Sequence, residues 1–423
     1  FPSLALGWNL HHESFFKPLL PIINRAKIRY SYGEVGSDAS TSRWLYTSSY
    51  INGNNGVNYY PGTAGSPGPS RTTIIEELAA NENATWEKAI KQDIGIELEF
   101  FNSMFVLNLD FYKERRTQIL LSRKSVPDWF GVGMKQQNLG ETKTQGYEID
   151  LKFQQTTSGG FYYWLKPSIS FSDNRIVERD EPMNKPAYQK EAGKRIFQPF
   201  GYQWTGMIQN PDEQMNSLRY GSGLMGLGDS QWVDFNGDGV ISELDKVPIG
   251  YSTLYPLYNF SLGGGFRYKN FELTFLFQGV TDISKVVIDS YSWPLQRLSN
   301  KVFDYQLDAW SPNNRDAQYN AFHFDANRIH NNINDNTIRA TNIYDGSYIR
   351  LKTLSLSYAV PKRAVKKMGL NKLQIFIRGN NLFTWSPNYP LADPEASDGD
   401  NSNWTSWGYY PMLRRVTLGA QIA

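Results

Sequence analysis

The sequence predicts an all-β protein: a segment of a transmembrane antiparallel β-barrel, with long loops at one end of the strands. Three observations predict this fold class. Apolar and polar side chains alternate along many segments, charged residues occupy the polar positions, and short turns alternate with long connections. Such strands average out as polar, which agrees with the mean hydropathy of −0.50.

The first clear hairpin covers residues 93–111, with a turn at Asn102-Ser103. Side chains on a strand point alternately to opposite faces, so each face can be read from every second residue. The apolar face comprises Ile94, Ile96, Leu98, Phe100, Leu107, Leu109 and Phe111, and the polar face Asp93, Glu97, Glu99, Asn108 and Asp110. We expect the apolar face to meet lipid and the charged face to meet a wet lumen.

The same alternation recurs along the chain, in the segments 147–153, 165–171, 258–268, 271–278, 373–378 and 416–422. Glu148, Asp150 and Glu272 lie on the polar face, whereas Phe260, Leu262, Leu273, Phe275, Leu418 and Ile422 lie on the apolar face. The alternation changes phase within the segment 349–358. The apolar residues Ile349 and Leu351 are at odd-numbered positions, whereas Leu354 and Leu356 are at even-numbered positions. This change predicts a β-bulge near Lys352-Thr353.

The connections support a barrel. Short ones lie at residues 102–103, 156–160 and 269–270, and long ones at 35–84, 117–141, 175–200, 201–255, 280–345 and 384–410. Outer-membrane barrels place short turns in the periplasm and long loops outside the cell. We count roughly eleven spanning strands, an odd number that would leave one edge unpaired. The segment Pro361 to Gly369 is predicted to form a short basic helix among the turns.

Composition excludes several classes of protein. The 423 residues contain 43 Lys and Arg against 41 Asp and Glu, without the basic excess of a nucleic-acid-binding protein. There is no Cys, so disulfides and thiolate sites are excluded. The catalytic motifs G-x-S-x-G and H-E-x-x-H are absent, and Gly221 to Gly226 matches G-x-G-x-x-G without the strand and helix a dinucleotide site requires. The sequence therefore predicts no enzyme.

The segment 234–245 predicts a calcium site. Asp234, Asn236, Asp238, Val240 and Asp245 occupy positions one, three, five, seven and twelve of a calcium-binding loop, with Gly239 at position six. Calcium requires several hard oxygen ligands, here side-chain oxygens and the Val240 carbonyl, and we expect a structural Ca²⁺ that fixes a long loop. The alternative is a turn held by Asp and Asn side chains without an ion.

Aromatic residues on the long loops are the candidate ligand contacts, because flat rings can stack on a captured ligand. They are Trp44, Tyr46, Trp129, Trp204, Trp232, Trp293, Trp404 and Trp407. The alternative for each is packing between loops or contact with a partner protein. His323 and His330 lie in a polar loop, where an ordinary surface role is the simpler interpretation.

Several segments resemble the SusC/RagA-type TonB-dependent transporters of Bacteroidota. They are Ile28 to Gly36, Asn138 to Gly140, Gly146 to Glu148, Asp234 to Gly239, Tyr348 to Tyr358, Gly379 to Trp385 and Asp393 to Glu395. These segments keep the family order. The family's barrel has about twice as many strands, so residues 1–423 are expected to form the C-terminal part of one 22-stranded barrel domain. The plug and N-terminal extension are expected outside this chain.

The resemblance implies active import of nutrient oligomers across the outer membrane of a Gram-negative bacterium. It also implies a SusD-like surface lipoprotein as partner, outer-membrane lipid around the barrel, and TonB acting through segments outside this chain. Oligosaccharides are the expected substrate, and oligopeptides are the main alternative. An outer-membrane barrel hydrolase and a soluble β-rich adhesin are the rivals from other classes. Activity assays on the purified protein and detergent dependence of its extraction would separate them.

Overall fold

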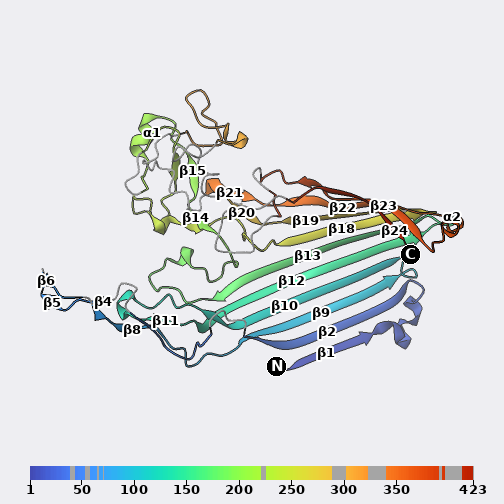
Figure 1. Ribbon diagram of the computed structural model, residues 1–423, viewed down its shortest axis with the longest axis horizontal. Coiled ribbons are helices and arrows are strands. Elements are labelled where there is room, and N and C mark those ends of the chain that lie inside the picture. Colours follow the sequence, from blue (N-terminus) through green and yellow to red (C-terminus); the bar gives the residue numbers. More distant parts are fainter. Residues whose placement is uncertain are drawn as a thin grey trace.

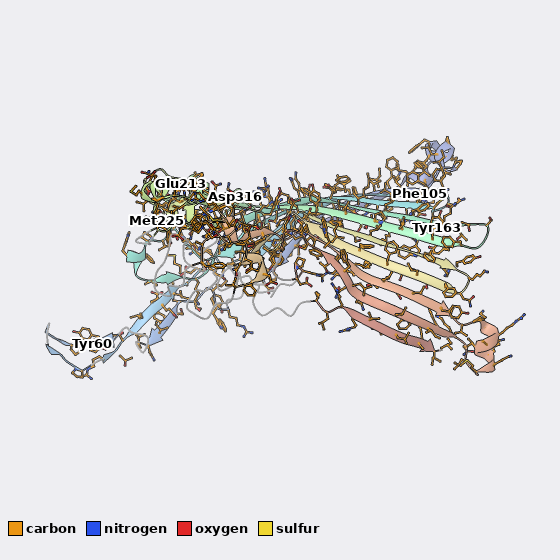
Figure 2. The ribbon with its side chains drawn as sticks, turned by 90° about the horizontal axis from the view of Figure 1, so that it is seen from above. Tyr60, Phe105, Tyr163, Glu213, Met225 and Asp316 are labelled. Carbon is orange, nitrogen blue, oxygen red and sulfur yellow. The ribbon has the colours of Figure 1, made fainter. Side chains whose placement is uncertain are left out.

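The computed structural model describes residues 1–38, 43–52, 58–63, 66–69, 71–220, 225–287, 302–322, 340–389, 393–395 and 412–422. Within these residues, the dominant feature is one antiparallel sheet of eleven strands, in the order β1-β2-β9-β10-β12-β13-β18-β19-β22-β23-β24. The strands follow one another without crossovers and form one curved wall (Figures 1 and 2). This is the meander that an up-and-down barrel requires.

The wall strands are β1 (Ser3–Asn9), β2 (Ile23–Ser37), β9 (Glu87–Phe100), β10 (Phe105–Leu121), β12 (Gln137–Thr156), β13 (Tyr162–Glu178), β18 (Tyr258–Tyr268), β19 (Phe271–Thr281), β22 (Tyr348–Ala359), β23 (Leu373–Trp385) and β24 (Arg415–Ile422). Several extend further than the sequence predicted. β10 continues to Leu121 and β12 begins at Gln137, so the connection predicted at 117–141 is much shorter. The outer end of β10 lacks the alternation, because Ile119, Leu120 and Leu121 are consecutive apolar residues and the pairing with β12 shifts register there.

The register confirms which residues share a face. Leu109 lies opposite Ile96 on one neighbour and Ile149 on the other, while Asp110 lies opposite Glu148. The predicted bulge is confirmed, because the pairing of β22 with β23 shifts between Leu351 and Thr353. None of the thirteen residues predicted to lie on the apolar face is among the buried residues, and Leu418 is 77% exposed. The apolar face therefore lies on the outside of the wall, as predicted.

Aromatic rings form two belts on this apolar face. At the end with the short turns, here called the turn end, Phe105 and Phe153 lie 4.8 Å apart and Phe271 and Tyr358 also 4.8 Å apart. Towards the loop end, the second belt joins Phe111, Tyr147, Phe171 and Tyr258. At about 3.3 Å per residue, the six residues from Phe105 to Phe111 place the belts about 20 Å apart along the strand. Girdles of aromatic residues flank the apolar band on the outer face of transmembrane barrels.

The turn end holds the connections predicted to be short. Phe101, Asn102 and Ser103 all adopt left-handed backbone conformations in the turn between β9 and β10. The first connection contains the 3₁₀ helices η1 (Leu10–His12) and η2 (Ser14–Leu19). The predicted basic helix is confirmed as α2 (Lys362–Lys367). No helix in the described part of the chain is long and apolar enough to span a membrane.

The loop end carries two structures beyond the wall, both at the left of Figure 1. One is an arm built on the sheet β11-β8-β3, from β3 (Ser49–Asn52), β8 (Ile74–Ala79) and β11 (Gly133–Met134), with β4 (Asn58–Tyr59), β5 (Gly62–Thr63), β6 (Ser66–Pro67) and β7 (Arg71–Thr72) as its extension. The 3₁₀ helix η4 (Asp128–Phe130) lies in the same connection as β11. The arm shows that residues 49–52, 58–59, 62–63, 66–67, 71–72 and 74–79 form strands, where the sequence predicted only a long loop.

The other structure, here called the cap, comprises the described residues between 179 and 257, 282 and 287, and 302 and 345. It contains η5 (Ala187–Gln189), β14 (Phe200–Gly201), β15 (Trp204–Met207), α1 (Pro211–Asn216), β16 (Ser230–Trp232), η6 (Glu243–Asp245), β17 (Val247–Pro248), β20 (Ser284–Val286), η9 (Asp304–Gln306), η10 (Ala340–Asn342) and β21 (Ile343–Asp345). Tyr202, Trp232 and Ile241 form one buried cluster, and Met207, Trp310 and Ala317 another. The main apolar clusters of the described residues thus lie in the cap.

The described sheet is open. β1 pairs with β2 and β24 pairs with β23, and these two outermost strands do not pair with each other. The expectation that these residues alone do not close a barrel is therefore confirmed for the described strands, although two edges, at β1 and β24, are unpaired where one was predicted. An unpaired edge is not tolerated in lipid, so the wall needs further strands to complete a barrel.

Candidate functional site

The polar face of β2, β9 and β10 carries a network of ion pairs centred on Arg29. The Nη1 atom of Arg29 donates a hydrogen bond of 2.9 Å to Asp93, and its Nε lies 3.6 Å from Glu97. The same guanidinium also reaches Asp110, two strands away. Gly95 lies opposite Arg29 and makes this reach possible, because a Cβ there would lie 2.4 Å from the Arg29 Nε atom.

The network continues towards the turn end through Arg25 and Lys27. Arg25 donates to Glu97 and Glu99, each at 3.2 Å, and Lys27 lies 3.3 Å from Glu97. These groups alternate in sign and are partly exposed, so each pair stabilises the fold only weakly. They give the inner wall a hydrated, charged surface that suits a lumen containing water and polar ligands.

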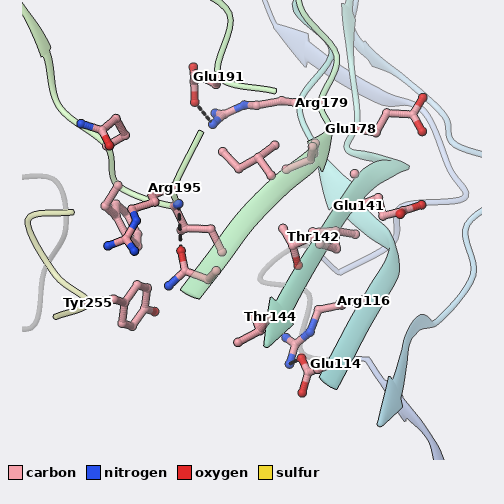
Figure 3. Close-up of a pocket in the computed structure, with 18 of the residues that line it drawn as sticks. Glu114, Arg116, Glu141, Thr142, Thr144, Glu178, Arg179, Glu191, Arg195 and Tyr255 are labelled. Atoms are coloured by element: carbon pink, nitrogen blue, oxygen red, sulfur yellow. Dashed lines mark hydrogen bonds and ion pairs between the residues drawn. The ribbon is translucent and has the colours of Figure 1, made fainter. Parts of the chain in front are cut away.

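A cavity of about 970 Å³ lies where this inner face meets the cap (Figure 3). Its wall side is formed by the outer ends of β10, β12 and β13, including Glu114, Arg116, Thr142 and Thr144. Its cap side is formed by residues 195–200 together with Lys246 and Tyr255. The cavity is large enough for a small ligand or one part of an oligomer.

Both signs of charge line this cavity. Arg116 donates to Glu114 at 3.2 Å, and Glu114 also lies 3.2 Å from Lys91. Across the cavity, the nearly buried Arg195 donates to Asp173 at 2.9 Å. Apolar residues complete the lining: Ile119, Leu121, Ile176, Ile196, Phe197, Pro199 and Phe200. Such a surface can hydrogen-bond polar groups of a ligand and cover its apolar faces.

Hydrogen bonds fix the cap side of the cavity to β13. The Ile176 amide donates to the Lys194 carbonyl at 2.9 Å, and the Ile196 amide donates to Asn174 Oδ1 at 3.0 Å. Glu181 accepts from Lys185 at 2.7 Å and from the Glu191 amide at 2.9 Å. Burial works to raise the pKa of Glu181, but these donors outweigh it and lower that pKa. Hydrogen bonds therefore fix the backbone of residues 191–196, on the cap side of the cavity.

A second charged cluster ties the connection between β23 and β24 to the inner face of β22. Arg350 is completely buried and donates to Glu395 at 2.8 Å, and it also contacts Asp393. Lys352 contacts Glu395 as well, and the Arg350 guanidinium lies 5.6 Å above the ring of Tyr348. Asp393 further accepts from the Met412 amide at 3.2 Å. The cluster joins residues that are more than 40 positions apart.

The predicted calcium loop forms a compact turn in the cap. Asp234 accepts from the amides of Gly237 at 2.7 Å and Gly239 at 2.8 Å, and these bonds lower its pKa despite some desolvation. Asp245 is 1% exposed and accepts from the amides of Phe235 and Ser242, each at 2.7 Å. Within the described residues, no group of three or more His, Cys, Asp or Glu is arranged to hold a metal ion. The calcium site stays a prediction.

The structure distributes the predicted ligand-contacting aromatics over two places. Trp44 and Tyr46 pack edge to face in the arm, 6.0 Å between centroids, and Trp129 in η4 is 85% exposed. Trp204 lies opposite Trp232 in the β15-β16 pair of the cap. Trp232 is 5% exposed and packs near Tyr202. This agrees with the alternative role of packing between loops, rather than with ligand contact. Trp293, Trp404 and Trp407, together with His323 and His330, lie outside the described residues.

The sequence did not single out the residues that line the cavity. Arg116, Arg179 and Arg195 belong to strand ends and to a connection without alternation, and only the fold brings them together. Glu114 and Arg116 do continue the even-numbered polar face of Asn108 and Asp110. This parity could have placed them on the inner wall, but not in a cavity.

The wall defines a class of protein: a transmembrane β-barrel with a charged lumen, a mouth cavity and a folded extracellular cap. No family model matches the chain. It is 27% identical to TonB-dependent receptor P3 of Formosa agariphila, over 99% of this chain and 41% of that protein. It is 25% identical to TonB-dependent receptor SusC of Bacteroides thetaiotaomicron, over 65% of this chain and 27% of that protein.

Solved structures agree with the fold. The RagAB peptide importer in its open-open state superposes with a TM-score of 0.76 at 17% identity, over 99% of this chain and 42% of that chain. The chain is therefore similar over its whole length to TonB-dependent receptors of the SusC/RagA type, which are outer-membrane proteins of Bacteroidota. It spans about two fifths of the length of the P3 receptor, and it matches the C-terminal part of such proteins.

Proposed function

We propose that the chain forms part of the wall and the extracellular cap of an active importer of nutrient oligomers. The observation that carries this proposal is the charged cavity at the mouth, between the inner face of β10, β12 and β13 and the cap. A ligand that enters the lumen from the loop end passes this surface. The relatives are receptors rather than enzymes, which supports transport instead of hydrolysis.

We propose oligosaccharides as the substrate, with charged members of that class favoured by the arginines of the cavity. Arg116 and Arg179 suit carboxylates or sulfates on sugar rings, because guanidinium groups form paired hydrogen bonds with such anions. Oligopeptides are the second candidate, because Glu114, Glu141 and Glu191 also line the cavity and a peptide carries charges of both signs. RagAB, whose fold is similar, is a peptide importer.

A SusD-like lipoprotein and TonB are the proposed partners. The cap has its own buried clusters and so offers a preformed surface for a lipoprotein at the mouth. TonB would act through a plug inside the barrel, and the ion pairs around Arg29 would line the space that holds this plug. We expect the plug and the segment that contacts TonB to lie in the complete receptor, outside residues 1–423.

Transport by the complete receptor in a deletion strain tests the cavity. The double variant Glu114→Gln and Arg116→Gln removes one acid and one base from the lining and leaves the net charge unchanged. We expect uptake of the cognate charged oligomer to fall about tenfold, the effect of losing one hydrogen bond to a charged group. Neutral glycans, acidic glycans and peptides are compared at equal receptor levels in the outer membrane.

Lys113→Gln is the matched control, because Lys113 is the neighbouring residue on β10 and is exposed on the opposite face. Uptake through this variant should equal that of the wild type. A double variant with unchanged uptake of every oligomer in the panel would refute a role for the cavity. Selective loss of peptide uptake would replace the oligosaccharide assignment by the peptide one.

We also propose that Asp234, Asn236, Asp238 and Asp245, with the Val240 carbonyl, bind one structural Ca²⁺. The support is the spacing and the convergence of Asp234 and Asp245 on the amides of one short turn. Calorimetric titration of chelator-treated receptor should show one site in the wild type and none in Asp238→Ala, while Asp212→Ala in α1 titrates like the wild type. If the wild type shows no binding heat, the calcium hypothesis is wrong, and residues 234–245 form a turn held by Asp and Asn side chains without an ion.

A further inference from the structure

The connection between β22 and β23 is the most basic segment at the turn end. Residues 360–372 contain Lys362, Arg363, Lys366, Lys367 and Lys372 and no acidic residue. The other connections at this end, at residues 10–22, 101–104, 157–161 and 269–270, contain two Lys or Arg residues in total, Lys17 and Lys269. We call Lys362, Arg363, Lys366, Lys367 and Lys372 the basic patch.

The patch is held in a defined shape. Val365 is 1% exposed, so this side of α2 is covered by the rest of the protein. Gly369 ends the helix with a φ of +72°, and the Leu370 amide donates to the Val365 carbonyl at 3.2 Å. The five cationic residues are all exposed, and within the described residues no carboxylate pairs with them. Their charges are therefore available to a partner outside this part of the chain.

The patch adjoins the aromatic belt of the turn end. The Ala359 amide, just before α2, donates to the Asn270 carbonyl at 2.8 Å and so joins this connection to the β18-β19 turn. Phe271 and Tyr358 form the belt immediately beside that junction. Lys269 lies 5.2 Å above the ring of Tyr268 at the same level. Figures 1 and 2 show α2 beyond the strand ends at this edge of the wall.

Aromatic girdles mark the boundary between the apolar band and water in transmembrane barrels. The patch therefore lies at the level of lipid headgroups, on the side of the short periplasmic turns. Exposed Met368, at 60%, adds an apolar side chain that can enter the boundary. Cations held at this depth attract anionic lipids, and each strengthens binding by about fivefold near a charged surface.

We propose that the basic patch on α2 binds the phosphate headgroups of anionic phospholipids in the periplasmic leaflet. Charge complementarity and the adjoining aromatic belt identify this occupant. Binding there would hold one side of the barrel rim at a fixed height in the membrane. The inference concerns the membrane surface of the protein and is independent of which oligomer is imported.

The test uses the complete receptor in nanodiscs made from phosphatidylethanolamine alone or with phosphatidylglycerol. Native mass spectrometry after transfer to mild detergent counts retained lipids. The variant Lys362→Gln, Arg363→Gln, Lys366→Gln and Lys367→Gln should retain anionic lipid at least tenfold less than the wild type. A second variant, Lys362→Arg, Lys366→Arg and Lys367→Arg, keeps the charges and should retain it normally.

The matched control removes four exposed lysines towards the loop end, by Lys88→Gln, Lys124→Gln, Lys143→Gln and Lys190→Gln. It should retain anionic lipid like the wild type, and heat-modifiable gel migration should show every variant folded. Equal retention by the α2 variant and the wild type overturns the proposal. So does an equal loss in the control, or a wild type that shows no preference for phosphatidylglycerol over phosphatidylethanolamine.

Discussion

The wall and the cap solve the problem of burying apolar surface in opposite ways. On the wall, Leu418, Ile377 and Phe111 are between 77% and 47% exposed, and backbone hydrogen bonds between neighbouring strands hold the sheet together. In the cap, Tyr202 and Ile208 are completely buried and Ile241 is 1% exposed. The wall needs lipid to cover its apolar face, whereas the cap covers its own. One chain therefore folds into parts that depend on two different solvents.

The largest effect is expected from Trp232→Ala, which should disrupt the cap and leave the wall intact. Removing a buried Trp costs about 3–5 kcal/mol, through lost transfer energy and the cavity left behind. Limited proteolysis should then cut residues 202–241 while heat-modifiable migration of the barrel persists. Trp129→Ala is the control, because Trp129 is 85% exposed and its loss should change stability by less than about 0.5 kcal/mol. Simultaneous loss of wall and cap would show that the two are one cooperative unit.

Arg350→Met tests the charged cluster that joins the wall strand β22 to the connection between β23 and β24. Asp393 would lose its guanidinium partner while remaining mostly buried, at a cost of about 3 kcal/mol. We expect the connection that carries Asp393 to become sensitive to protease, with less change in the cap. Arg267→Met is the comparison, since Arg267 is exposed and only lies over the ring of Tyr162. Unaltered protease resistance in Arg350→Met would show that the cluster does not hold this connection.

Leu109→Arg places a charge in the middle of the outer face, between the two aromatic belts. Arg near the bilayer midplane of a barrel costs about 2–4 kcal/mol. Urea unfolding in phospholipid vesicles should detect this loss. Asn108→Arg, on the adjacent inner position, should be tolerated because Asn108 lies opposite Glu97 and Asp150. Equal penalties at both positions would contradict the assignment of faces.

The smallest effect is a loss of cap stability in acid. The pKa values of Asp180, Glu181 and Asp234 are lowered in the folded protein, chiefly by hydrogen-bond donors that outweigh burial. A carboxylate with a lowered folded pKa stabilises the fold fully above its unfolded pKa, and this stability is lost as pH falls through the folded pKa. Hydrogen exchange in the cap should therefore accelerate below about pH 4, near the ordinary values of 3.8 and 4.5. Exchange that is independent of pH after correction for its chemical rate would contradict this.

Part of the fold was readable from local sequence. Alternation placed the wall strands and their faces, and the phase change at Lys352-Thr353 located a bulge that the pairing shows. The absence of acids from residues 360–372 set apart the basic helix. These features depend on neighbours along one strand or turn, because a period of two is a local property of the backbone.

Long-range contacts decided the rest. Met207, Trp310 and Ala317 pack together although more than 100 residues separate the first from the second, and no periodicity marks them as a core. The cavity joins Arg116 of β10 to Arg195 of the cap, and Arg350 meets Asp393 only because the connection after β23 returns to the wall. The sequence by itself determined which side chains face lipid, because every lipid-facing position of a strand needs an apolar side chain. This requirement can be read within each strand separately. Only the tertiary structure decided which polar groups meet at the mouth, because irregular loops position their side chains by contacts distant in sequence.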